Sequence, residues 1–353
     1  MGRATKQNNH STVSDWVNRD PKTWNAFQRL HNSVFSPNRA PGLPVPQKMP
    51  VISMLSQHMF IISFIMVPLS LHQTYVFMTG HSLAKLPTFL LYTSGYILST
   101  IQLARVLGHL AHRVGYLDNN VARDGLANTA AGKLISELAM TTGFRLAMAV
   151  ILAYNVDSSP WEALGGFQAC ISLLVKLSLY GPVLDLFFYI YHRACHEIPA
   201  LWMYHRTHHL NKHPTTVHAA FADEEQEMIE MVLVPALTYT TFWFAGYPLG
   251  FYEWWVCLQY ITYPELVGHS GLRVYATPPT PTSWFFQLLG VELVLEDHDL
   301  HHRKGWKKAV NYGKQTRIWD RLFGTCGERI ETVQGNVDLE NKIYLPIFVQ
   351  NTE

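Results

Sequence analysis

Residues 184–210 read LDLFFYIYHRACHEIPALWMYHRTHHL and join a strongly apolar segment to two groups of histidines. His192 and His196 are four positions apart, and residues at this spacing lie on the same face of a helix. The pattern predicts a helix that ends near Pro199 and a second helix that carries the HRTHH motif. The break would fold the two histidine groups toward each other.

Histidines are concentrated in one part of the chain, with 11 of the 18 between positions 192 and 302. The motifs HRTHH at 205–209 and HDLHH at 298–302 each place three imidazoles at spacings that share a helical face. So many neutral imidazoles together favour a bound metal, and they exceed what one tetrahedral ion can use. The sequence therefore predicts two metal ions with four to five nitrogen ligands each. The ligands predicted from these motifs are His192, His196, His205, His208, His209, His298, His301 and His302.

The composition indicates a membrane protein, because 48% of the residues are hydrophobic and only 15% are charged. Six apolar stretches approach the length of about 20 residues that crosses a bilayer as a helix. They form three hairpins: 56–78 with 87–107, 134–156 with 161–181, and 228–248 with 250–268. Arg145 and Lys176 lie inside such stretches, so hairpins that only enter the bilayer are an alternative to full spans. Buried helices of a soluble protein are the other alternative.

The distribution of positive charge predicts the orientation. Residues 1–50 and 105–133 are rich in Lys and Arg, whereas the connections at 79–86 and 157–160 are short and nearly uncharged. An excess of Lys and Arg marks the cytosolic side, and each hairpin returns the chain to that side. The predicted fold class is therefore all-α: an integral membrane bundle of apolar hairpins, with a cytosolic histidine-rich helical cap that holds a dinuclear metal site.

Charge and cysteine content exclude other classes. The formal net charge of +1 gives no reason to expect a nucleic-acid partner. The four cysteines have no CxxC spacing, which fits reduced thiols better than a disulfide scaffold.

The combined pattern HxxxH, HxxHH and HxxHH between apolar hairpins resembles the fatty acid hydroxylase superfamily, membrane di-iron enzymes that include sterol desaturases, methylsterol monooxygenases and sphingoid hydroxylases. DLFFYIYHRACH at 185–196 resembles the family's first motif, and HDLHHRKGWKKAVNYGKQTRIWDRLFGT at 298–325 resembles its closing signature. GHSG at 268–271 resembles an isolated family histidine, which implies that His269 is a further ligand. The likeness covers about residues 135–330.

The resemblance implies an O2-dependent di-iron hydroxylase acting on a C–H bond of a lipid-like substrate, such as a sterol, sphingoid, fatty acyl, isoprenoid or polyketide compound. It implies two iron ions, with zinc as a substitute in purified protein, and a multi-pass endoplasmic reticulum location. Cytochrome b5 and an NAD(P)H-dependent reductase are the expected electron donors, because the chain has neither a GxGxxG nor an HPGG motif. A desaturase or C–C cleaving oxidase is the alternative on the same scaffold. A zinc-binding membrane protein without redox chemistry is the alternative from another class.

The expected segments are a cytosolic N-terminal part at 1–50, a membrane hairpin and connection at 51–133, a catalytic domain at 134–330 and a C-terminal tail at 331–353. One position departs from the family pattern. Family members usually carry a histidine about 14 residues beyond the HxxHH motif, where this chain has Asp223. Asp223 is expected to replace it as an oxygen ligand, and recruitment of His218 or His213 is the alternative.

Two further carboxylates are candidates for a supporting role. Asp185 precedes His192 by about two helical turns and is expected to orient a ligand imidazole, unless it only lies on the helix face. Glu265 precedes His269 by one turn and could act as an auxiliary ligand or base, or simply lie at the membrane interface.

Overall fold

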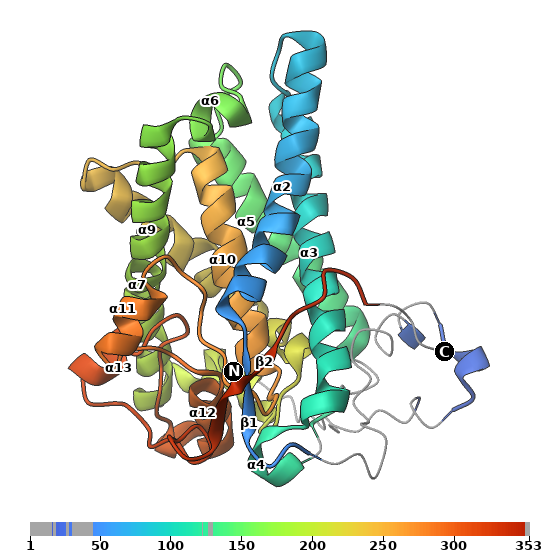
Figure 1. Ribbon diagram of the computed structural model, residues 1–353, viewed down its shortest axis with the longest axis vertical. Helices are drawn as coiled ribbons and strands as arrows, with labels where there is room; N and C mark the ends of the chain where they lie inside the picture. The colour runs from blue at the N-terminus through green and yellow to red at the C-terminus, as the bar shows by residue number, and fades with distance from the viewer. Residues whose placement is uncertain are drawn as a thin grey trace, which may run out of the picture.

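The computed structural model is mostly helical, which confirms the predicted helical class, and its long helices run beside one another (Figure 1). It describes Trp16 and residues 19–25, 28–29, 45–121, 123–125 and 130–349, without the side chains of 130–138. Most of the expected segment 1–50 therefore lies outside the described residues. The division of the chain at positions 50, 133 and 330 stays a prediction.

The long helices of the described chain coincide with the predicted apolar stretches. They are α2 (Met54–Thr79), α3 (Lys85–Val114), α5 (Ala130–Ala153), α7 (Phe167–Glu197) and α10 (Phe251–His269). Shorter elements continue the bundle: α6 (Pro160–Leu164), α8 (Glu224–Met228), a π-helical turn at Ile229–Leu233 and α9 (Val234–Phe244). The predicted stretch 161–181 is interrupted at Gly165, where a Cβ would lie 2.6 Å from a backbone carbonyl oxygen.

Helix α10 is the centre of the bundle and packs against α2, α3, α5, α7 and α12 (Leu295–Lys304). All of its side chains are buried except Glu265, which is partly exposed, and Trp254 and Trp255 are completely buried. Burial of large aromatic side chains contributes strongly to stability. The helix therefore fixes the position of His269, its last residue, relative to the rest of the bundle.

Two helices among the described residues, α2 and α7, are long and apolar enough to cross a bilayer. This is fewer than the six predicted. Helix α9 has only 11 residues and α10 is buried by its neighbours, so neither presents a long apolar face to the outside. The full predicted set of spans stays a prediction.

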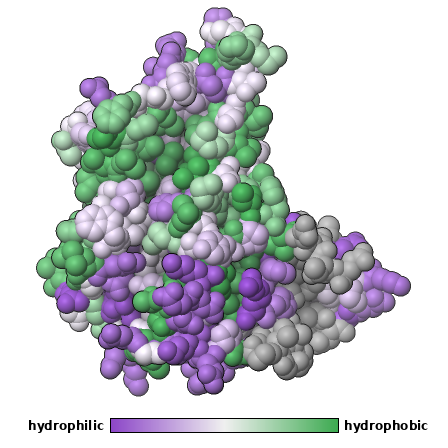
Figure 2. Space-filling view, in the orientation of Figure 1, coloured by the Kyte–Doolittle hydropathy of each residue, from purple (hydrophilic) through white to green (hydrophobic). Residues whose placement is uncertain are grey.

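The surface of the bundle is nevertheless apolar. Figure 2 shows hydrophobic residues over the upper part of the molecule and hydrophilic residues over the lower part. Phe77 of α2 is 88% exposed, Phe167 of α7 is 82% exposed and Phe244 of α9 is 77% exposed. Large exposed apolar surfaces are typical of contact with a lipid phase or another protein.

The hydrophilic end of the bundle, at the bottom of Figure 1, contains most of the short elements and the loops. These elements are α4 (Leu117–Asn120), α11 (Ser283–Leu288), α12, α13 (Ile318–Leu322) and the 3-10 turn Trp306–Lys308. Strands β1 (Met49–Ile52) and β2 (Val337–Ile343) pair in parallel, with Met49 opposite Val337 and Ile52 opposite Ile343. This pairing ties the C-terminal part of the chain to the residues that lead into α2.

The predicted second helix around the HRTHH motif is wrong. Helix α7 ends at Glu197, and Ile198 is extended, because a residue before proline disfavours the helical conformation. The following segment consists of separate 3-10 turns at Trp202–Tyr204, His208–Leu210 and Thr216–Ala220. The chain therefore turns repeatedly beneath the bundle instead of running straight.

Candidate metal centre

Nine of the ten predicted ligands form two compact groups at the loop end of the bundle. In each group, one ligand atom per residue lies within 4.8 Å of all the others. The five-histidine group consists of His192, His196, His205, His209 and His301. The four-histidine group consists of His208, His269, His298 and His302. This division matches the predicted four to five nitrogens for each of two ions.

Neighbouring histidines in the sequence belong to different groups. His208 and His209 have ring planes at 90° to each other, and so do His301 and His302. Each HxxHH motif therefore contributes to both groups. A regular helix does not prevent this division, because the HDLHH motif lies on helix α12 and its histidines still belong to both groups.

Hydrogen bonds to backbone carbonyls fix the orientation of most rings. A carbonyl oxygen can only accept, so the ring nitrogen that contacts it must carry the proton. The donors are Nδ1 of His192, His196, His208, His269, His301 and His302, to the carbonyls of Tyr312, Trp306, Phe221, Glu265, Val310 and Asn211, at 2.7–3.2 Å. A neutral imidazole that donates through Nδ1 keeps its lone pair at Nε2, which is the atom left for a metal.

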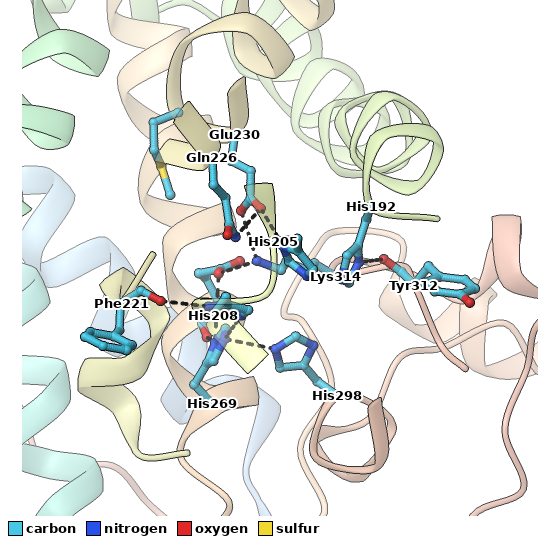
Figure 3. Close-up of polar contacts among 12 residues, drawn as sticks. His192, His205, His208, Phe221, Gln226, Glu230, His269, His298, Tyr312 and Lys314 are labelled. Carbon is cyan, nitrogen blue, oxygen red and sulfur yellow. Dashed lines mark hydrogen bonds and ion pairs between the residues drawn. The ribbon is translucent and has the colours of Figure 1, made fainter. Parts of the chain in front are cut away.

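The free lone pairs face one another. Nε2 of His208 lies 3.2 Å from Nε2 of His269, although both rings donate their single proton elsewhere (Figure 3). Two lone pairs at this distance repel each other, so the contact is not a hydrogen bond. Protonation would remove the repulsion, but burial lowers the pKa of His208 well below the ordinary value of 6.5. A cation between the two nitrogens satisfies both, and the residues therefore fit a bound metal.

The five-histidine group converges in the same way. Nε2 of His209 lies 3.1 Å from Nε2 of His196, 3.1 Å from that of His205 and 3.0 Å from that of His301. Nε2 of His192 is buried and has no hydrogen-bond partner among the described residues. Imidazole nitrogens suit iron, zinc, copper and nickel alike, so the donor set alone does not identify the metal.

The loop with the NYG sequence contains two of the carbonyl acceptors, those of Val310 and Tyr312. The sequence does not identify these carbonyls individually. Asn311 is in the left-handed region with φ 57°, and the backbone amides of Tyr312 and Gly313 each donate to the Asp320 carboxylate at 2.8 Å. Gly313 has no room for a side chain, because a Cβ would lie 2.5 Å from a backbone carbonyl. This geometry aims the carbonyls of Val310 and Tyr312 at ligand rings. The closing signature was the only available sign of this role.

Asp185 supports the same loop and not an imidazole. Its buried carboxylate accepts hydrogen bonds from the backbone amides of Lys314, Gln315 and Thr316 at 2.7–3.1 Å. These residues follow Tyr312, whose carbonyl binds His192. The influence of Asp185 on the site is therefore transmitted through the backbone.

The structure places Asp223 and its two alternatives outside both groups. The Asp223 carboxylate accepts a hydrogen bond of 2.5 Å from the Thr207 hydroxyl. Nε2 of His213 lies 3.0 Å from the Asp118 carboxylate, and Nδ1 of His218 accepts a hydrogen bond from a nearby backbone amide. Both groups of the described chain thus contain histidine alone. A role of Asp223 as a ligand stays a prediction.

Glu265 belongs to a charged triad beside the histidines. The Lys314 ammonium lies 2.8 Å from the Glu265 carboxylate. It also lies 3.3 Å from the carboxylate of Glu230, and Figure 3 labels these two residues. Burial by itself would lower the pKa of Lys314, but the two carboxylates raise it above its ordinary value. The lysine therefore stays charged, and Glu265 serves as its counterion as well as lending its carbonyl to His269.

A stacked pair of tryptophans covers the five-histidine group. The rings of Trp202 and Trp306 are 5.2 Å apart and nearly parallel. The Trp202 ring lies 5.1 Å from that of His196 and 5.6 Å from that of His209. The indole of Trp306 also donates to the backbone carbonyl of His196 at 2.9 Å. The pair thus packs against one side of the group, next to an open pocket that is lined by His196 and Trp306.

A cavity opens on the other side of the triad, toward the bundle. Glu230, Glu265 and Lys314 form its polar end, and Leu184, Phe188, Val234, Ile261 and Leu266 contribute apolar walls. The cavity lies between α3, α5, α7 and α10, and Glu265 in its lining also accepts the hydrogen bond of His269 through its backbone carbonyl. The lining also contains Arg145, Glu227 and several hydroxyl groups, so the cavity presents both apolar and charged surface to a ligand.

Comparisons with known proteins agree with the motifs. The model of the fatty acid hydroxylase family matches residues 177–325, which contain all nine clustered histidines. The chain is 42% identical over 321 residues to the fatty acid hydroxylase vlmA of Lecanicillium sp, and the alignment covers 87% of each chain. No solved structure matches the chain.

Proposed function

The chain belongs to the fatty acid hydroxylase family, and on this basis we propose that it is a membrane-bound, O2-dependent di-iron hydroxylase of a lipid-like substrate. The observation that carries the proposal is the pair of histidine groups. Their Nε2 atoms converge, and most of their Nδ1 atoms are already used by backbone carbonyls.

One iron ion in each group would account for the two donor sets. Five and four imidazoles would hold the ions without taking part in electron transfer themselves. When reduced, such a centre supplies the activation of dioxygen that inserts one oxygen atom into a C–H bond, with two electrons and two protons consumed and water released. The carbonyl acceptors keep the ligand rings in place during this chemistry.

The other residues of the site would bind the substrate and determine the polarity of the cavity. The apolar walls around Phe188 and Ile261 favour a hydrocarbon chain next to the metal groups. The Lys314 ammonium compensates part of the negative charge of two buried carboxylates, which lowers the cost of placing them beside such a chain.

The exposed apolar surface supports placement of the bundle in a membrane, with the histidine-bearing end in the cytosol. A location in the endoplasmic reticulum follows from the family resemblance and from the expected donors, cytochrome b5 and an NAD(P)H-dependent reductase. A substrate from the bilayer would reach the cavity between the helices. The sphingoid, sterol, fatty acyl and isoprenoid or polyketide classes share this route.

The test is turnover of a lipid panel in the presence of 18O2, with purified protein, cytochrome b5, its reductase and NADH. We expect a product that contains one 18O atom and retains the saturation of the substrate. A product with a new double bond and no 18O would indicate a desaturase instead. Absence of any O2-dependent product, in protein that holds zinc despite iron supply, would contradict the proposal and support the zinc-binding alternative.

A further inference from the structure

A second apolar surface lies on two short helices next to the histidine-bearing end, α11 and α13. Trp284 and Leu322 are each 66% exposed, and Leu288 is 75% exposed. Apolar surface of this kind on a folded protein usually marks a contact site. We call the exposed large apolar side chains of these two helices the rim patch: Trp284, Phe285, Leu288, Leu289, Leu322 and Phe323.

Hydrogen bonds hold the two helices of the rim patch beside each other. The Arg321 guanidinium of α13 donates to the carbonyl of Gly290, two residues beyond the end of α11, at 3.1 Å. At the start of α11, the buried Ser283 hydroxyl accepts a hydrogen bond from the Thr280 amide at 2.7 Å. The fold therefore presents these apolar side chains from braced helices and not from a loose loop.

The segment that carries α11 contains no charged residue. Residues 274–291 include no Asp, Glu, Lys or Arg, whereas α12, which follows, has both acidic and basic residues within 10 positions. A helix that lies in a membrane interface places Trp, Phe and Leu on its buried face, and Trp is enriched at the level of the lipid headgroups. The composition of α11 fits this environment better than contact with water.

The apolar surface of α7 extends to the level of the rim patch. The Phe323 ring of α13 stacks on the Tyr189 ring of α7 at 5.5 Å, and the neighbouring Ile190 is 56% exposed. Helix α7 is one of the two described helices that are long and apolar enough to cross a bilayer. Figure 2 shows hydrophobic residues along the left edge at the height where Figure 1 labels α11, with hydrophilic residues below them. This continuity favours lipid over a separate protein as the partner of the rim patch.

We propose that the rim patch inserts into the cytosolic leaflet of the membrane. Its apolar side chains would lie among the upper parts of the acyl chains. The exposed Arg321, between the two helices, would lie at the level of the lipid phosphates. The inference rests on the placement of the bundle in a membrane, which is part of the proposed function.

Contact of α13 with lipid would also set the depth of the metal centre. Asp320 of α13 accepts hydrogen bonds from the amides of Tyr312 and Gly313, and the Tyr312 carbonyl orients the ring of His192. A helix held in the leaflet is thus joined through one carboxylate to the loop that supports the five-histidine group. The rim patch would hold this group at a constant distance from the bilayer surface.

Quenching by spin-labelled lipids tests the insertion. Leu288→Cys is labelled with the fluorophore NBD in a background of Cys170→Ser and Cys326→Ser, because the other two cysteines are buried. The labelled protein is placed in phosphatidylcholine nanodiscs that hold a single chain. The nanodiscs contain phosphatidylcholine spin-labelled on its acyl chain, either close to the headgroup or at the middle of the chain.

Two control positions define the scale. Lys308→Cys places the fluorophore on an exposed turn of the hydrophilic end, and Leu179→Cys places it on the exposed apolar face of α7. We expect the headgroup-proximal spin label to quench Leu288→Cys roughly three- to fivefold more strongly than Lys308→Cys, as for a side chain in the interface. The mid-chain spin label should quench Leu179→Cys most strongly.

Equal quenching of Leu288→Cys and Lys308→Cys, with strong quenching of Leu179→Cys, would overturn the inference and leave the placement of the bundle in a membrane intact. Emission from Leu288→Cys that is typical of an apolar environment but is not quenched by either lipid would also overturn it, and would indicate a protein contact. Absence of quenching at Leu179→Cys would overturn the membrane placement together with the inference.

Discussion

Two adjacent residues, His208 and His209, belong to different histidine groups. Their rings are perpendicular and join sets of ligands that come from different elements. His208 joins His269 at the end of α10, whereas His209 joins His192 and His196 from α7. Single substitutions at these neighbouring positions should therefore have different consequences.

We expect His208→Ala and His209→Ala each to reduce the metal content from about two ions per chain to about one and to abolish turnover, because each removes a ligand from one group only. The double variant should lose both ions. Elemental analysis of purified protein measures this, with His213→Ala as a control that keeps both ions. Loss of both ions from each single variant would contradict two separate groups.

Asp223 was expected from the sequence to be a ligand, but it lies outside both groups. Its carboxylate binds the Thr207 hydroxyl, next to His208 in the chain. We expect Asp223→Ala to keep the wild-type metal content while lowering the free energy of unfolding by roughly 1–3 kcal/mol, because one charge-assisted hydrogen bond is lost. Elemental analysis and thermal unfolding in detergent measure the two quantities. A loss of metal that Asp223→His restores would show that the aspartate is a ligand after all.

At the scale of elements, the loop from Val310 to Thr316 joins the metal centre to the bundle. Asp320 at the start of α13 binds the amides of Tyr312 and Gly313, and Asp185 of α7 binds the amides that follow. Neither carboxylate hydrogen-bonds to a histidine. Together they set the backbone whose carbonyls fix His192 and His301.

Asp320→Ala should weaken metal binding to the five-histidine group by about 10- to 100-fold, since the carbonyls that hold two of its rings lose their support. The four-histidine group, whose acceptors come from other segments, should keep its affinity. Competition with a chelator of known affinity resolves the two sites. An equal loss of metal affinity in both groups, or no loss in either, would contradict this assignment.

The sequence predicted the helices and the clustered histidines because both depend on local patterns. Apolar runs identified the positions of α2, α3, α5 and α10, and the spacing in HDLHH is that of the real helix α12. The second helix predicted at the HRTHH motif is wrong, because the segment after Pro199 forms short 3-10 turns whose histidines contact α10 and α12, elements far away in the sequence. The carbonyl acceptors and the Lys314 ion pairs could not be predicted from local patterns either, because they join residues far apart in the sequence.

At the scale of the whole molecule, the apolar surface and the histidine-bearing end lie at opposite parts of the structure (Figures 1 and 2). Positive charge predicts that the histidine-bearing end faces the cytosol. Two exposed cysteines lie on suitable elements to test this orientation. Cys170 is near the start of α7, and Cys326 follows α13.

A membrane-impermeant maleimide added to sealed endoplasmic reticulum vesicles should modify Cys326 and leave Cys170 unmodified until detergent is added. Cys195 and Cys257 are buried and should not react in folded protein. Mass spectrometry of peptides from treated protein identifies the modified cysteine, and Cys326→Ser provides the control. Modification of Cys170 with protection of Cys326 would reverse the proposed orientation.

The most direct measurement of the central claim is the iron content per chain of protein purified from an iron-supplemented host, before and after chelation. The account predicts about two iron ions per chain, loss of turnover when they are removed, and recovery with Fe2+ but not with Zn2+. Wild-type turnover without iron, or zinc in both groups despite the supply of iron, would contradict it.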